Sequence, residues 1–103
     1  MATHVTVTIS GGAISADPET LSVLKSEKNV NIQWDIATDG WSFTADGIVI
    51  PDNDGQFTEP QASGKKFKWT NKHSNTVPKT YKYNIKATDG STTLENDPWI
   101  VNE

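Results

Sequence analysis

Few side chains in this 103-residue chain could carry metal, redox or nucleophilic chemistry. There is no cysteine, which excludes a disulfide framework, a thiolate zinc site, an iron–sulfur cluster and a cysteine nucleophile. A blue-copper electron-transfer site is excluded for the same reason. The two histidines, His4 and His73, stand far apart in the sequence, and their polar neighbours predict that both lie at the surface. We therefore expect no cofactor and no bound metal.

Serine nucleophiles are available at Ser10, Ser42 and Ser74. Serine catalysis needs a base within hydrogen-bond reach and a third group that orients this base. His73 and Ser74 are sequence neighbours, and neighbouring side chains of an extended chain point to opposite sides. The sequence therefore predicts a protein that is not an enzyme.

One acidic loop suggests a hard cation. Asp52, Asp54 and Glu59 lie close in sequence, and calcium prefers several carboxylate and carbonyl oxygens on a flexible loop. The EF-hand pattern does not fit, because placing Gly55 at its sixth position puts Ile50 at the first, where a carboxylate is required. A solvated turn is the prediction, and a weak calcium site is the alternative.

Four tryptophans are many for so short a chain. Trp34 stands on an unbroken apolar strand face, and Trp69 shares a face with a phenylalanine, so we expect both in the core. Trp41 and Trp99 each follow a turn and are expected at the rim of the fold. An exposed indole there could stack on a sugar ring or anchor a protein partner. The alternative is that both side chains cap the ends of the core.

Four lysines alternate along two of the expected strands: Lys66, Lys68, Lys82 and Lys86. If these strands share one sheet, the ammonium groups crowd one outer face of the protein. Such a face could dock an acidic protein or a polyanionic glycan. The alternative is that it keeps the sheet soluble and discourages edge pairing.

The charge balance bears on partners and location. Nine Lys and Arg against thirteen Asp and Glu give a net charge of −4, which disfavours nucleic acid as a partner. No run of apolar residues is long enough for a membrane span. Residues 1–10 lack the basic and apolar regions of a signal peptide, so we expect a soluble chain with no leader in this segment.

Alternation of apolar and polar residues with a period of two dominates the chain and indicates strands. The expected strands cover residues 5–9, 20–23, 29–36, 41–43, 48–50, 66–69 and 81–88, with closing strands around 94 and 99–101. We expect a hairpin turn at Asp46-Gly47 and a long surface loop over residues 52–64. Apolar residues nowhere recur at helical spacing over ten positions. The pattern predicts an all-β single domain over residues 1–103: a monomeric, antiparallel β-sandwich of about seven strands without a long helix.

Two segments carry a family resemblance. Residues 17–34, with Leu21, Val23, Ile32 and Trp34 at strand spacing, resemble the early strands of cupredoxin-like sandwiches. The resemblance implies that fold without its copper site, because residues 35–40 and the segment after Tyr83 contain no Cys, His or Met to serve as ligands. Residues 81–102 also resemble the end of small bacterial β-sandwich proteins with no established activity. The topology is therefore expected to be immunoglobulin-like or cupredoxin-like.

These observations favour a non-enzymatic interaction module that uses its loops and the lysine-bearing sheet face. A carbohydrate-binding module that uses Trp41 or Trp99 is the first alternative, and a loop that binds calcium weakly is the second.

Overall fold

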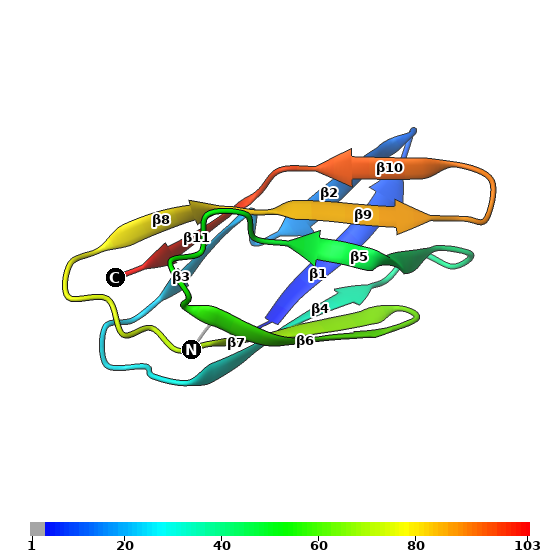
Figure 1. The fold of residues 1–103 in the computed structure, drawn as a ribbon. Coiled ribbons are helices and arrows are strands. Elements are labelled where there is room, and N and C mark those ends of the chain that lie inside the picture. The colour runs from blue at the N-terminus through cyan, green and yellow to red at the C-terminus, as the bar shows by residue number, and fades with distance from the viewer. Residues whose placement is uncertain (1–3) are drawn as a thin grey trace.

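The computed structural model describes residues 4–103, which form eleven strands and no helix (Figure 1). The strands are β1 (His4–Ser10), β2 (Ala13–Asp17), β3 (Thr20–Val23), β4 (Val30–Ile36), β5 (Ser42–Val49), β6 (Phe57–Ser63), β7 (Lys66–Asn71), β8 (Lys79–Lys82), β9 (Asn84–Thr88), β10 (Thr93–Asn96) and β11 (Trp99–Asn102). The prediction of an all-β chain without a long helix is confirmed for these residues. The described part has no helix able to cross a membrane. The signal-peptide prediction falls partly on residues 1–3, which lie outside the described part.

Five strands form the larger sheet, in the order β2-β1-β4-β7-β6. β1, β4 and β7 follow the clearest alternating runs of the sequence, and each turns its apolar side chains to one face. Val5 and Val7 of β1 and Ile32 and Trp34 of β4 are fully buried. β1 and β4 run parallel, whereas the other three strand pairs of this sheet are antiparallel.

A long hairpin forms the centre of the opposite layer. Its first arm consists of β8 and β9, and its second arm consists of β10 and β11, which pair with β9 and β8 in one continuous register. The arms are interrupted where the Tyr83 N–H donates to the Pro98 carbonyl oxygen (3.1 Å), because Pro98 has no N–H to return the bond. β3 joins this hairpin parallel to β11, and β5 joins it antiparallel to β9, which completes two three-stranded sheets.

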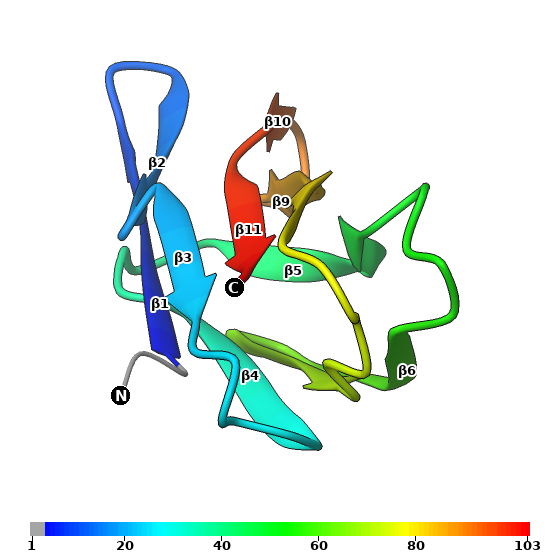
Figure 2. The same ribbon diagram turned by 90° about the vertical axis from the view of Figure 1, so that its left-hand side faces the viewer.

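One hydrophobic core lies between the layers. Figure 2 separates β4 and β6 on one side from β9, β10 and β11 on the other. Three edge-to-face aromatic pairs, with ring centroids 5.3–5.8 Å apart, each join the larger sheet to the opposite layer: Trp34 with Tyr83, Phe67 with Phe43, and Phe57 with Tyr81. Such pairs add stability beyond the area they bury and fix how the layers meet.

The strand count and pairing differ from the prediction. The described residues form eleven strands instead of about seven, because β2 and β6 were not expected and one expected strand is divided in two. The run over residues 81–88 breaks at Tyr83, where the first hairpin arm passes from one sheet to the other. A purely antiparallel arrangement is also wrong, since β1 with β4 and β3 with β11 are parallel pairs.

One expected turn and part of one expected loop belong to strands. Asp46-Gly47, predicted as a hairpin turn, lies inside β5, whose register against β9 slips between Phe43 and Ile48. The turn residues form a bulge instead, and a Cβ at Gly47 would stand 2.7 Å from that of Phe43.

The predicted loop over residues 52–64 is wrong in its second half, which is the edge strand β6. β6 has its own register slip between Thr58 and Gln61, with Glu59 at a φ of 57° before Pro60. Most of its side chains are exposed, so no apolar alternation marks it in the sequence.

Candidate binding groove

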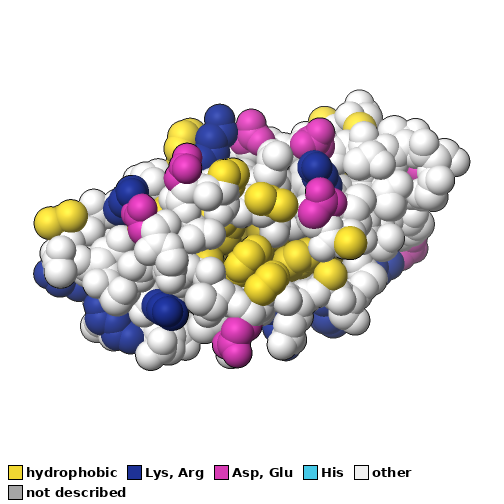
Figure 3. All heavy atoms as spheres, viewed as in Figure 1, with side chains coloured by type: hydrophobic (Ala, Val, Ile, Leu, Met, Phe, Trp, Pro, Cys, Tyr) yellow, Lys and Arg dark blue, Asp and Glu magenta, His cyan; other side chains and the backbone are white. Residues whose placement is uncertain are grey.

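An open groove of about 530 Å³ runs beside β8, where β5 ends. Its walls come from three separate parts of the chain: Pro51 and Asp52 after β5, residues 79–84 of the first hairpin arm, and Asp97 with Trp99 at the start of β11. Figure 3 shows this face of the molecule, with hydrophobic side chains visible between β5 and β6 and basic and acidic side chains around them. The volume lies in the usual range of ligand sites.

Trp99 is the exposed aromatic residue of the groove, with 41% of its surface accessible. It lies directly opposite Lys82 in the pairing of β11 with β8. The Lys82 ammonium stands 5.4 Å from the centre of the indole ring and 3.6 Å from an Asp97 carboxylate oxygen. The cation–π contact and the ion pair hold a basic group over the ring, so that the groove presents an aromatic surface and a positive charge together.

The other end of the groove carries Lys79 and Tyr81. Lys79 forms an ion pair with Asp54, which lowers the pKa of that carboxyl group, and its ammonium lies 5.4 Å from the centre of the Tyr81 ring. Tyr81 Oη donates to Asp54 Oδ2 (3.2 Å) and accepts from the Asn75 side-chain amide (2.7 Å). Burial raises the pKa of the Tyr81 phenol, so this hydroxyl stays a neutral donor.

Tyr83 connects the groove to the core. Its side chain is buried, and its hydroxyl accepts a hydrogen bond from Trp34 Nε1 at 2.9 Å. Burial raises the pKa of Tyr83 to about 12. The floor of the groove at Tyr83 is therefore a fixed and uncharged aromatic side chain.

The predicted lysine face is not formed. Lys66 and Lys68 lie on β7 in the larger sheet, whereas Lys82 lies on β8 and Lys86 on β9 in the two smaller sheets. The expectation that these strands share one sheet is wrong because the hairpin arms join the opposite layer. Lys66, Lys82 and Lys86 each pair with an aspartate, at 2.9, 3.6 and 3.0 Å. Of the four predicted lysines, Lys82 borders the groove.

The two rim tryptophans of the prediction are separated. Trp99 lies in the groove, whereas Trp41 is half-buried, packs against the core and is not among the groove residues. Trp34 is fully buried as predicted. Trp69 packs at the edge of the core, where its Nε1 donates to the Ile48 carbonyl oxygen (3.0 Å).

The three acidic residues of the calcium alternative do not come together. Asp52 lines the groove and Asp54 is paired with Lys79, while Glu59 lines a separate polar cavity of about 160 Å³ on the larger sheet. Across residues 4–103 no three His, Asp or Glu side chains are grouped as metal ligands. Glu59 lies at the bulge of β6, apart from the other two carboxylates, so this geometry does not support a calcium loop.

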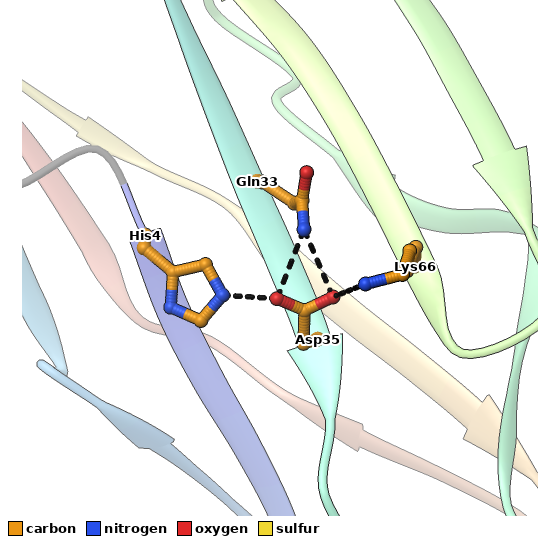
Figure 4. Close-up of polar contacts among 4 residues, drawn as sticks. All are labelled: His4, Gln33, Asp35 and Lys66. Atoms are coloured by element: carbon orange, nitrogen blue, oxygen red, sulfur yellow. Dashed lines mark hydrogen bonds and ion pairs between the residues drawn. The ribbon is translucent and has the colours of Figure 1, made fainter.

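His4 lies on the outer face of the larger sheet, as predicted, and belongs to a polar cluster on Asp35 (Figure 4). Asp35 Oδ1 accepts from Lys66 (2.9 Å), the Gln33 amide donates to both Oδ1 (3.1 Å) and Oδ2 (3.0 Å), and Oδ2 also contacts His4 Nε2. Partial burial alone would raise the pKa of Asp35, but the hydrogen bonds from Lys66, Gln33 and His4 outweigh it and lower the pKa to about 2. Lys66 thus has a structural partner on this sheet.

The prediction that His73 lies at the surface is wrong. The side chain is fully buried, with Nδ1 2.9 Å from the Glu27 carbonyl oxygen and Nε2 2.8 Å from the Glu103 carbonyl oxygen. Its backbone N–H donates to the Asn71 side chain, which exchanges hydrogen bonds with the buried Asn102. His73 therefore fastens the 72–78 loop to the C-terminal strand. Its polar sequence neighbours gave no local signal of burial, because the contacts come from residues far away in the chain.

No protein-family model and no curated protein sequence matches this chain. Of the groove residues, Trp99 and Lys82 were predicted from the sequence, whereas Lys79, Thr80 and the free edge of β8 were not. One signal for that edge was present in the sequence: Pro51 directly follows an apolar strand run and stops it.

Proposed function

We propose that this chain is a non-catalytic binding domain, a monomeric β-sandwich of immunoglobulin-like or cupredoxin-like topology, whose groove beside β8 recognises a protein partner. The observation that carries the proposal is the exposed indole of Trp99 with the Lys82 ammonium beside it, at the rim of an open groove. Tryptophan and charged neighbours of this kind are typical anchors of protein interfaces.

The rigidity of the groove supports a role in recognition. Tyr81 and Tyr83 are both buried, and each makes an edge-to-face contact with an aromatic ring of the larger sheet. A surface that is already ordered loses less conformational entropy when a partner binds. The groove therefore resembles a preformed docking surface.

The placement of the histidines supports a non-catalytic role. His73 is held between two backbone carbonyl groups, and His4 is engaged with Asp35. A general base needs a nucleophile or substrate within hydrogen-bond reach, and the partners of both rings are structural.

A capture experiment with three immobilised proteins tests the proposal: the native chain, the Trp99→Ala variant and the Lys68→Glu variant. Lys68 lies on the larger sheet, away from the groove, and serves as a matched surface control. We expect one protein to be retained by the native chain and by Lys68→Glu, and to be lost from Trp99→Ala. Equal retention by Trp99→Ala, with the fold intact by circular dichroism, would overturn the proposed site.

A carbohydrate-binding module is the second candidate. It is favoured by the exposed indole of Trp99 with Asp97 and Asn84 nearby, because sugar sites combine an aromatic platform with polar groups that bind hydroxyls. A glycan array distinguishes the candidates. Binding of a neutral glycan that Trp99→Ala abolishes would replace the protein partner with a sugar.

A further inference from the structure

We propose that the partner binds as an added β-strand along the free edge of β8, and that this segment carries an acidic residue opposite Lys82. This inference rests on the proposed function and names the binding mode and the partner chemistry. It follows from the direction of the backbone hydrogen-bonding groups of β8.

Three backbone hydrogen bonds fix that direction. The N–H groups of Trp99 and Glu103 donate to the carbonyl oxygens of Glu19 and Val23, so the odd-numbered residues of β11 face β3. The Tyr83 N–H donates to the Pro98 carbonyl oxygen on the second arm of the hairpin, so the backbone groups of Tyr83 face that arm. Because backbone groups alternate along a strand, the N–H and C=O groups of Tyr81 face β11, and those of Thr80 and Lys82 face away from it.

Pro51 leaves that side of β8 unpaired. β5 pairs with β9 as far as Val49, which lies opposite Asn84. The same register would place Pro51 opposite Lys82, but proline has no N–H to donate to the Lys82 carbonyl oxygen. The chain turns away at Pro51 and Asp52, and within residues 4–103 no strand follows β8 in its sheet. Thr80 and Lys82 thus present two N–H and two C=O groups along the groove.

Three other edges, those of β6, β2 and β10, are protected. β6 carries Pro60 and a bulge, which disrupt a regular ladder. β2 and β10, the outer strands of two different sheets, lie against each other, and the Asn96 side chain donates to the Ile14 carbonyl oxygen (2.9 Å). The edge of β8, in contrast, lies beside an open groove, which gives an added strand room.

The charges of β8 select the partner. The side chains of Thr80 and Lys82 are exposed on the outer face. The Lys82 ammonium pairs with Asp97 at 3.6 Å, and its remaining N–H groups can donate to a carboxylate on the added strand. Opposite charges at such cross-strand positions are favourable, and like charges are unfavourable. Antiparallel pairing of β8 with a second copy would bring two Lys82 side chains onto one face near each other. The geometry therefore favours an extended segment of a different protein with an acidic residue on the face of Lys82.

A pair of N-methylated peptides tests strand addition. The parent probe is a capped octapeptide of alternating Glu and Val. In one derivative the backbone nitrogens of all Glu residues are methylated, and in the other those of all Val residues are methylated. Only one alternate set of N–H groups faces β8, so we expect one derivative to lose at least tenfold in affinity and the other to bind like the parent. Failure of the parent peptide to bind, or equal binding of both derivatives, would overturn the inference.

Two variants at Thr80 test the same edge from the protein side. Thr80→Pro removes an N–H that the β8–β11 ladder does not use, whereas Thr80→Ala keeps it. We expect Thr80→Pro to lose at least tenfold in peptide affinity and Thr80→Ala to change little. If Thr80→Pro unfolds, the peptide pair alone decides. If both methylated derivatives bind and Trp99→Ala abolishes binding, strand addition fails while the proposed groove stands. If the captured partner also binds the Trp99→Ala variant as well as it binds the native chain, both proposals fail.

Discussion

Tyr83 lines the groove and is also part of the hydrophobic core. Its ring packs edge-to-face on Trp34 at 5.3 Å, and its hydroxyl is the acceptor for the indole N–H of that residue. Both side chains are almost fully buried. An indole N–H that lost this acceptor would remain in an apolar environment without a partner.

We therefore expect Tyr83→Phe to destabilise the fold by about 1–3 kcal/mol, because the ring is kept while the acceptor for Trp34 is lost. Urea unfolding followed by tryptophan fluorescence measures the change. A free energy of unfolding equal to that of the native chain would show that the Trp34 N–H finds another acceptor.

Asp35 makes the stability of the fold depend on pH in the acid range. Its folded pKa, about 2, lies below the ordinary value of 3.8, so folding stabilises the charged form. This contribution is present above about pH 4 and is lost as the pH falls toward 2. We expect Asp35→Asn to be less stable than the native chain at pH 6 by on the order of 1 kcal/mol, since the group is partly exposed. The difference should shrink at pH 2.5 in urea titrations, and a constant difference would contradict this account.

Among the elements, β8 is paired on one side only, and this predicts its amide exchange. The N–H of Tyr81 faces β11, whereas the N–H groups of Thr80 and Lys82 face the groove. In the free protein we expect Thr80 and Lys82 to exchange their amide protons at least tenfold faster than Tyr81, because exposed and unpaired N–H groups exchange most readily. Heteronuclear NMR after transfer to D₂O measures the rates. Slow exchange at Lys82 would mean that the edge is already paired.

Regular strands could be predicted from the sequence and irregular ones could not. β1, β4 and β7 alternate strictly, since one face of each packs on the core, and their positions were predicted closely. β5 contains Asp46-Gly47, a pair that favours a turn in isolation, but its pairing with β9 forces a bulge there. β6 is exposed along most of its length, so burial imposed no pattern on its residues.

At the scale of the whole molecule, the groove depends on contacts between distant parts of the chain. Trp99 and Lys82 were identified in the sequence as separate candidates, and the register of β8 with β11 places them together. The sheet that carries each of Lys66, Lys68 and Lys86 could not be predicted, because alternation along a strand does not indicate which sheet the strand joins. The burial of His73 likewise follows from the C-terminal strand folding back onto the 72–78 loop.

The central claim is that the groove beside β8 is the binding surface of this domain. The most direct measurement is the amide ¹H–¹⁵N spectrum of the labelled protein during titration with the captured partner. We expect the largest shifts at residues 51–52, 79–84 and 97–99, and little change at Lys66 and Lys68 on the larger sheet. Shifts centred on Lys66 and Lys68, with the groove residues unchanged, would contradict the claim.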